Sequence, residues 1–197
     1  MSEHGQKTCG VVGARRRVVT GLAVGLYLFQ PWRLVTDREV REALPSVAEP
    51  QPAGTSGPSP SGTAGPSATG AAPADVLLAA GDFVTHEHDT SGRAQLVRLA
   101  DGRRQLLLRG LDTSDGPDLR VWLTDRKVLP GRAGWQVFDD GRWVELGRLK
   151  GNIGDQAYDI PASVDLDGLR SVSIWCKRFA VSFGAAPLAG VTGSAPA

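Results

Sequence analysis

The sequence predicts an all-β domain, either an antiparallel β-sandwich or a barrel-like fold, preceded by one transmembrane helix and a disordered linker. Short apolar segments recur from about residue 80 onward, separated by Gly, Pro and Asp turns, which is typical of such domains. No window in this region has the pattern of an amphipathic helix of about ten residues or more. An apolar run over residues 18–35 predicts the membrane helix.

The overall composition limits the function classes. The chain has 197 residues and a net charge of +1, which suits one domain plus flanking segments. Proteins that bind nucleic acid usually carry a basic stripe, and this balance argues against nucleic acid as a partner. The two cysteines, Cys9 and Cys176, lie on opposite sides of the predicted membrane helix. That separation argues against an intramolecular disulfide.

The amino-terminal segment has the features of a signal-anchor. Only Gln30 and Arg33 are strongly polar between residues 18 and 35, and a spanning helix needs about 17 to 20 apolar residues. The arginines at 15–17 would keep residues 1–17 in the cytoplasm, and Trp32 would lie at the far interface. We therefore expect a single-pass protein of the cell membrane that contacts the bilayer through residues 18–35, with its carboxy-terminal domain extracytoplasmic.

Two other interpretations of this segment stay open. A cleaved secretory signal would use the small residues at 46–48, although these lie far beyond the apolar run. The segment could also be a buried part of a folded domain. Residues 36–48 are interpreted as a juxtamembrane segment, and the mixed charges of residues 37–44 predict a short helix that Pro45 would end.

A low-complexity linker follows. Residues 49–74 are almost entirely Pro, Gly, Ser, Thr and Ala, a composition that cannot build a packed core. We expect a flexible linker over residues 49–79, a folded domain over residues 80–188 and a flexible tail over residues 189–197. Such a linker would hold the folded domain away from the membrane.

The strands of the domain follow in order. Residues 83–84 begin a short apolar element. Residues 95–99 and 105–109 flank Asp101 and Gly102, and Asp-Gly favours the positive φ angles of a tight β-hairpin turn. Residues 119–123 alternate between apolar and polar positions, as expected for a half-buried strand.

A second hairpin and two more strands are predicted further along. Residues 135–138 and 142–146 flank Asp139, Asp140 and Gly141, which have the same turn chemistry. The remaining short strands are predicted at residues 158–160 and 172–174.

The apolar positions of residues 171–183 (SVSIWCKRFAVSF) alternate and then shift by one. They are Val172, Ile174 and Cys176 before the shift, and Phe179, Val181 and Phe183 after it. A shift of this kind indicates a β-bulge or a tight turn at Lys177 and Arg178. Cys176 is therefore expected on the core face of a strand, and Trp175 on the opposite face.

Several segments resemble one protein family. Residues 112–119, 146–161 and 172–186, together with 81–83 and 91–92, look like the DM-thirteen domain, also called the electron-transfer DM domain. The resemblance covers about residues 80–188. The amino-terminal third looks like that of bacterial members with a membrane anchor and a spacer.

The resemblance implies an all-β extracellular domain with a role in electron transfer and an unidentified redox or surface protein partner. In the family, a motif cysteine is proposed to act as a free thiol or as a ligand of a prosthetic group such as haem. Cys176 occupies that position in this sequence.

Three roles are open for Cys176. A free cysteine is often a small buried hydrophobe. It can also be a reactive thiol or a metal or haem ligand, in which case Lys177 and Arg178 would stabilise the thiolate. The third role is an intermolecular disulfide.

Other chemistry has weaker support. His86 and His88 are two residues apart, so on one strand both imidazoles would reach one metal ion, although an exposed strand face is the simpler interpretation. No G-x-S-x-G, H-E-x-x-H or phosphate-loop motif occurs, which argues against a hydrolase or a transferase. The two functions that remain are a redox domain centred on Cys176 and a non-catalytic surface binding or adhesion module with a structural cysteine.

Overall fold

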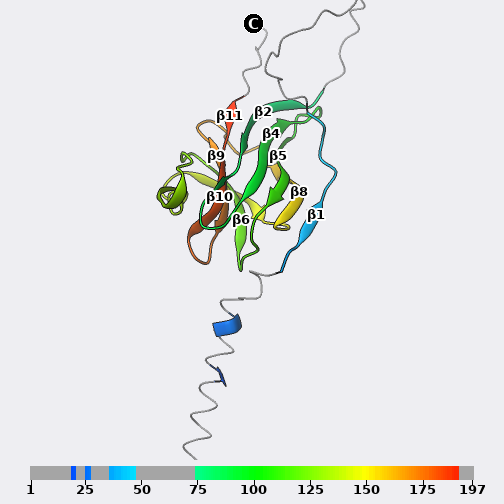
Figure 1. Cartoon of the computed structure of the whole chain (residues 1–197). Helices are drawn as coiled ribbons and strands as arrows, with labels where there is room; N and C mark the ends of the chain where they lie inside the picture. Colours follow the sequence, from blue (N-terminus) through cyan, green and yellow to red (C-terminus); the bar gives the residue numbers. More distant parts are fainter. Residues whose placement is uncertain (1–18, 21–24, 28–35, 48–73, 191–197) are drawn as a thin grey trace, which may run out of the picture.

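The computed structural model describes residues 19–20, 25–27, 36–47 and 74–190, and these include a β-sandwich of two sheets (Figure 1). The first sheet has the order β1 (Glu39–Arg41), β8 (Ile153–Ile160), β5 (Arg104–Asp112), β4 (Ser91–Arg98), β2 (Val76–Asp82) and β11 (Ala189–Gly190). The second has the order β3 (Val84–Thr85), β10 (Val181–Pro187), β9 (Ser171–Cys176), β6 (Leu119–Thr124) and β7 (Trp143–Arg148). The predicted all-β class is confirmed.

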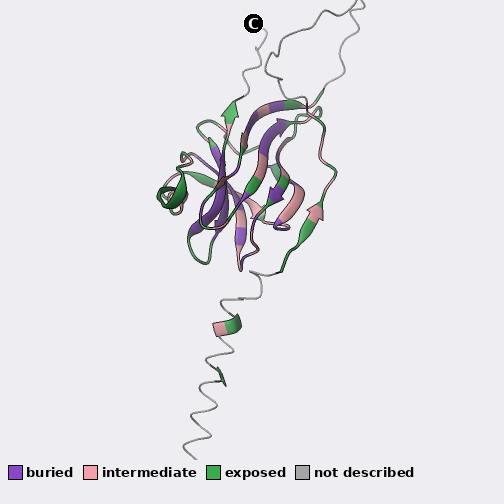
Figure 2. Cartoon of the chain, viewed as in Figure 1, coloured by how far each residue is buried: buried purple, intermediate pink, exposed green. Residues whose placement is uncertain are grey.

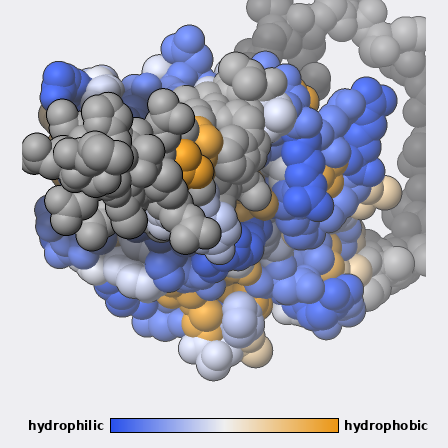
Figure 3. Space-filling model, turned by 90° about the horizontal axis from the view of Figure 1, so that it is seen from below, coloured by the Kyte–Doolittle hydropathy of each residue, from blue (hydrophilic) through white to orange (hydrophobic). Residues whose placement is uncertain are grey.

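The main core lies between the two sheets. Strand residues alternate between faces, so every second side chain of β5, β6 and β9 enters this core. Leu106, Leu108, Val121, Leu123 and Ile174 are all fully buried there. Figure 2 shows the buried residues along these central strands, with exposed residues mainly in the connections. On the face seen in Figure 3, hydrophilic residues predominate and hydrophobic ones form small separate patches.

The first predicted hairpin is confirmed. Strands β4 and β5 pair antiparallel, and their last paired residues, Arg98 and Arg104, flank the turn that contains Gly102. Gly102 has a φ of 86°, a conformation that glycine adopts without a steric penalty. Local turn chemistry was therefore sufficient to predict this pairing.

The second predicted hairpin is wrong. Residues 135–138 form no strand, and β7 pairs instead with β6, with Trp143 opposite Thr124. Residues 125–142 leave β6, form the short 3₁₀ helix η2 (Gly131–Gly134) and cover the outer face of the second sheet. The Trp135 carbonyl accepts a hydrogen bond of 2.7 Å from the Ser182 amide, and Phe138 is buried against this face. The apolar residues of this segment pack onto a sheet rather than extend it.

The pattern shift after Cys176 is a tight turn. Residues 177–180 connect β9 to β10, and Val181 pairs directly with Cys176. Ala180 has a φ of 51°, and the Phe179 amide donates a 3.2 Å hydrogen bond to the Cys176 carbonyl. Phe179 is exposed, because it lies in the turn and not on the core face where the alternation had put it. The strand pair also contains an irregularity between Ser182 and Gly184.

The helix predicted for residues 37–44 is wrong, because residues 39–41 form β1, which pairs in parallel with β8 at the edge of the first sheet (Figure 1). Asn152 accepts a 2.6 Å hydrogen bond from the Arg38 amide. Glu42 accepts hydrogen bonds from the Lys150 ammonium at 2.7 Å and the Ala157 amide at 2.8 Å. These tertiary partners outweigh the weak local preference for a helix, and β1 covers an edge that would otherwise be open.

Several predicted segments lie wholly or mostly outside the described residues, namely the cytoplasmic tail at 1–17, the membrane helix at 18–35 and most of the linker at 49–79 and the tail at 189–197. In the parts of the chain that the structure describes, none of the helices has the length and apolar character needed to cross a bilayer. β1, the first residues of β2 and β11 lie outside residues 80–188 and pair with the first sheet.

Candidate functional site

Cys176 is the last residue of β9 and lies in the main core. It pairs with Val181 on β10 and with Leu119 on β6, so its strand is flanked on both sides. Its exposed fraction is 0%. It is the free cysteine of the described residues, which do not include Cys9. The expectation that Cys176 faces the core agrees with this position.

The environment of Cys176 favours the protonated thiol. Burial raises the pKa of the Cys176 thiol. Backbone hydrogen bonds from Phe179, Arg178 and Asp118 oppose this effect without reversing it, and the nearby charge of Glu87 adds to the rise. Because the thiolate is the nucleophile and the metal ligand, the closed domain holds Cys176 in its less reactive form.

The charged side chains of Lys177 and Arg178 do not lie around the Cys176 sulfur. Lys177 Nζ lies 3.3 Å from Glu145 Oε2, on the outer face of the second sheet. Lys177 and Arg178 are exposed residues of the turn at 177–180, and Arg178 affects the Cys176 thiol through its backbone. The amides of this turn therefore supply the polar contacts that were expected from the two side chains.

A haem does not fit at Cys176 in this structure. The side chain is fully enclosed in the core, and Cys176 lines neither of the two described pockets. A haem ligand needs open space for the macrocycle beside the sulfur. Binding would require the strands around Cys176 to separate.

His86 and His88 do not point to one metal ion. They lie in bends between β3 and β4 rather than on a strand. His86 Nδ1 lies 2.8 Å from Ser182 Oγ, and His86 Nε2 lies 3.0 Å from the Leu129 carbonyl. The His88 ring lies against Phe183, with 3.9 Å between ring centroids. Within the described ranges, no group of three His, Cys, Asp or Glu residues could hold a metal.

His86 belongs to a buried hydrogen-bond chain that the sequence did not predict. The Leu129 carbonyl can only accept, so Nε2 donates to it and Nδ1 can only accept. The one proton of the Ser182 hydroxyl has two acceptors in reach, His86 Nδ1 at 2.8 Å and the Gly184 carbonyl at 3.1 Å. The Ser173 hydroxyl donates in turn to Ser182 Oγ at 3.0 Å. A serine beside an imidazole is a common nucleophile arrangement. Both serines are fully buried here. This hydrogen-bond chain therefore holds β9, β10 and the covering segment (residues 125–142) together, and no substrate can reach it.

The neutral state of His86 predicts a pH dependence of stability. Burial lowers the pKa of His86 from its ordinary value of 6.5, although the Leu129 carbonyl opposes the shift. The unfolded chain then binds the proton more readily, so the His86 contribution is complete above pH 6.5 and falls as the pH drops below it. Urea unfolding at neutral and mildly acidic pH should show this loss, and His86→Gln should reduce it. His88→Gln is the control and should keep the wild-type dependence, and an equal loss in His86→Gln would contradict the assignment.

Three tryptophans stack on the outer face of the second sheet. The rings of Trp122 and Trp143 have centroids 4.1 Å apart and an interplanar angle of 5°. The rings of Trp122 and Trp175 lie 5.0 Å apart at 22°. Phe138 meets Trp175 edge-on at 6.4 Å. Alternation predicted that Trp175 lies on the side away from the core, and the order β7-β6-β9 brings all three indoles together.

An ion network borders the stack. Arg120 forms salt bridges of 2.7 Å to Asp118 and 2.6 Å to Glu145, and Lys177 also binds Glu145. Trp122 Nε1 donates a 3.3 Å hydrogen bond to Glu145 Oε2. Burial raises the pKa of the Glu145 carboxyl, but the hydrogen bonds from Trp122 and Lys177 and the charge of Arg120 outweigh burial, and the net shift is downward.

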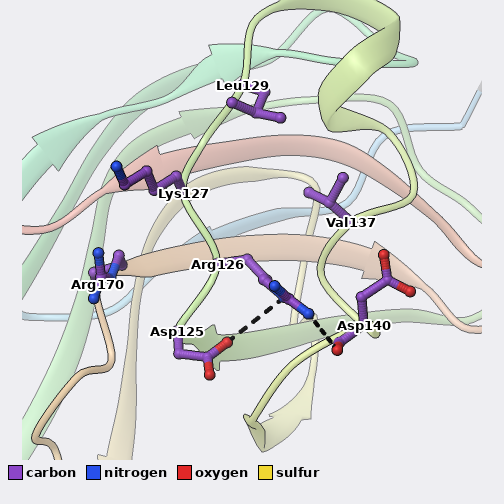
Figure 4. Close-up of a pocket in the computed structure, with 7 residues that line it drawn as sticks. All are labelled: Asp125, Arg126, Lys127, Leu129, Val137, Asp140 and Arg170. Atoms are coloured by element: carbon purple, nitrogen blue, oxygen red, sulfur yellow. Dashed lines mark hydrogen bonds and ion pairs between the residues drawn. The ribbon is translucent and has the colours of Figure 1, made fainter.

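A shallow pocket opens in the covering segment. Its volume is about 450 Å³. Figure 4 shows the seven lining residues, which are Asp125, Arg126, Lys127, Leu129, Val137, Asp140 and Arg170. Arg126 binds the Asp140 carbonyl, and its Nε lies 3.9 Å from Asp125 Oδ1 (Figure 4). Arg126 Nε and Asp125 Oδ1 are both buried, and neither has a hydrogen-bond partner. None of the residues predicted as functional lines this pocket.

Comparison with known proteins identifies one family. Residues 82–188 match the family model described as Electron transfer DM13. No curated protein and no solved structure matches the chain. The matched range includes Cys176, Glu145 and the stacked tryptophans Trp122, Trp143 and Trp175.

Proposed function

The chain belongs to the Electron transfer DM13 family, and on that premise we propose that it is a membrane-anchored, extracytoplasmic electron-transfer domain whose redox centre is Cys176. The observation that carries the proposal is that Cys176, the cysteine of the matched range, lies on a central strand next to a tight turn. Electron transfer is the family's description. The role of Cys176 and the membrane anchor go beyond that description.

The proposed anchor is the apolar run at residues 18–35 with the arginines at 15–17 before it. In this arrangement residues 36–38 connect the proposed membrane segment to β1, so the sandwich begins close to the membrane, and the expected linker runs between β1 and β2 instead of between the membrane and the sandwich. Fractionation of cells that produce the full-length protein tests the topology. We expect the protein in the membrane fraction, with the domain cut by protease added outside the cytoplasmic membrane. Recovery in the soluble cytoplasmic fraction would contradict the anchor.

The burial of Cys176 in the closed structure limits how its thiol would react. The protonated, enclosed thiol is a poor reductant, so the proposed reaction requires the turn at residues 177–180 to move away from the sulfur. An oxidised metal centre of a partner protein would then take one electron from the thiol, and water would take its proton. The partner is a redox or surface protein.

One observation favours the second candidate function, a binding or adhesion module. The 0% exposure of Cys176 and its apolar neighbours are also what a purely structural cysteine shows. In that case the thiol contributes packing alone. The two candidates differ in what the native thiol can do, and this difference can be measured.

Thiol reactivity in the purified full-length Cys9→Ser variant tests the proposed function, because Cys176 is then the single cysteine. We expect native Cys176 to be oxidised slowly by hexacyanoferrate(III), at a rate that rises when low urea loosens the turn. The Cys9→Ser/Cys176→Ala double variant is the matched control for other oxidisable groups. A thiol that reacts only after global unfolding would contradict the redox role and favour the binding module.

Two single substitutions of Cys176 test its packing. Cys176→Ser should lower the free energy of unfolding by about 1–3 kcal/mol, because the backbone amides around the site can donate to the serine oxygen but the buried hydroxyl proton gains no assured acceptor. Cys176→Ala keeps the site apolar and should cost less than the serine variant. Urea unfolding measures both values. Equal stability of wild type and Cys176→Ser would contradict the enclosed, apolar environment.

A further inference from the structure

The stack of Trp143, Trp122 and Trp175 leads from solvent to the interior. Trp143 has an exposed fraction of 39%, whereas Trp122 and Trp175 are exposed by only 3% and 2%. The face of Trp122 lies nearly parallel to that of Trp143. An electron that leaves the exposed ring can therefore be replaced from a buried ring in direct contact with it.

The strand register makes this geometry rigid. Trp122 on β6 lies opposite Glu145 on β7 and Ser173 on β9. Trp143 and Trp175 are its diagonal neighbours, one on each side, at the spacing that long aromatic side chains bridge. Phe138 closes the inner end of the stack against Trp175. Rings held on three adjacent strands change little in position when their charge changes.

We infer that this stack is a one-electron relay between a docked oxidant at Trp143 and the interior of the domain, with Glu145 as the proton acceptor of Trp122. The inference rests on the proposed electron-transfer function, and it adds the surface at which electrons leave. The inner ring, Trp175, precedes Cys176 in the chain, on the opposite face of the same strand.

Glu145 is placed for the proton step. Its Oε2 already accepts the hydrogen bond from Trp122 Nε1, and Arg120 and Lys177 hold the carboxylate in position. The net downward shift of the Glu145 pKa keeps this group ionised at neutral pH, so it has a free site for a proton. An oxidised indole is far more acidic at its nitrogen than a neutral one, so oxidation of Trp122 is what permits the transfer, against the lowered proton affinity of the Glu145 carboxylate.

A one-electron oxidant stronger than an oxidised indole, such as an oxidised metal complex, takes one electron from Trp143 and is reduced by one electron. Trp122 then transfers one electron to the oxidised Trp143, and the Nε1 proton of oxidised Trp122 moves to the Glu145 carboxylate. The products are the reduced metal complex, a neutral radical on Trp122 and a protonated Glu145. When a one-electron reductant refills the stack, the proton returns from Glu145 to Nε1.

Ordinary aromatic packing is the competing explanation of the stack. Each aromatic pair adds about 0.5–1.5 kcal/mol to stability beyond the area it buries. Packing alone accounts for neither a carboxylate at the indole nitrogen of the central ring nor a face-to-face partner that remains open to solvent. A test must therefore measure electron transfer and not stability.

Flash-generated tris(bipyridine)ruthenium(III) supplies the oxidant in the test, with the purified full-length protein in detergent. We expect rapid formation of a neutral tryptophanyl radical, seen by transient absorption and by electron paramagnetic resonance. Trp122→Phe keeps an aromatic ring but removes the relay, so it should abolish the neutral radical of Trp122 and leave the radical on the exposed Trp143, which loses its proton to solvent. Glu145→Gln should leave the radical in its protonated, cationic form.

Trp135→Phe is the matched control, because Trp135 lies outside the stack and its Nε1 has no hydrogen bond. It should keep the wild-type radical. Equal losses in Trp122→Phe and Trp135→Phe, or a neutral radical that persists in Glu145→Gln, would overturn the relay. Cys176→Ala separates the two proposals. If its radical signal is unchanged while Cys176 is unreactive in the thiol assay, the relay stands and the role proposed for Cys176 fails.

Discussion

Replacing Phe138 by alanine is expected to lower the free energy of unfolding by about 3–5 kcal/mol, the range for a fully buried phenylalanine. Phe138 has an exposed fraction of 0% and fills the space between Trp175 and the ring of His86, which lie 6.4 Å and 5.7 Å from its centroid. Its loss leaves a cavity beneath residues 125–142, because the strands of the second sheet cannot close over it. Urea unfolding followed by tryptophan fluorescence measures the change.

Phe179→Ala is the matched control for this prediction. Phe179 lies in the turn after β9 with 42% of its surface exposed, so its loss should change stability by about 0.5 kcal/mol or less. If Phe138→Ala is as mild as Phe179→Ala, the covering segment at residues 125–142 does not form a second core with Trp122 and Trp175. The same result would also weaken the case for a rigid tryptophan stack.

The second large effect is expected at Asn152, which is 1% exposed and joins the amino-terminal segment to the sandwich. Its side chain accepts from the Arg38 amide and donates to Asp37 and to the Thr113 carbonyl, at 2.6, 2.9 and 2.8 Å. Asn152→Ala should lower the free energy of unfolding by about 2–4 kcal/mol, because three hydrogen bonds are lost and the carbonyl of the buried Thr113 is left unsatisfied. It should also release β1 from β8.

Hydrogen exchange of the amides at residues 39–42 reports the release of β1 directly. Gln105→Ala is the matched control, because Gln105 is also an amide bonded to a carboxylate, at 2.8 Å from Asp159, but on the surface. It should change stability by about 0.5 kcal/mol or less. Unchanged exchange at residues 39–42 in Asn152→Ala would show that β1 is held mainly by its backbone pairing and by Glu42.

The two predicted hairpins show where sequence reasoning succeeds. Gly102 follows an aspartate between two apolar segments, and the strands on either side do pair. Gly141 also follows aspartates between apolar segments, yet Trp143 pairs with Thr124 on β6. A turn motif predicts a local reversal of the chain, but a distant strand competes for the same backbone groups. That competition depends on the whole fold.

The amino-terminal segment shows the same limit. The mixed charges near Glu42 were consistent with a short helix, because local propensity is all that an isolated segment displays. Lys150 and Asn152, more than a hundred positions away, supply the partners that make a strand instead. Such partners cannot be found from one sequence without the fold.

At the candidate site, alternation along β9 was sufficient to put Cys176 on the core face and Trp175 on the other. It could not supply the depth of burial that raises the Cys176 pKa, nor the contact between Trp175 and Trp122, because both depend on the neighbouring strands. The sequence by itself determined the all-β class, the first hairpin and the faces of Cys176 and Trp175, since these follow from turn chemistry and a period of two, and its motifs showed the family. Only the tertiary structure decided the strand order, the covering segment and the stacked indoles, because these arise from contacts between residues far apart in the chain.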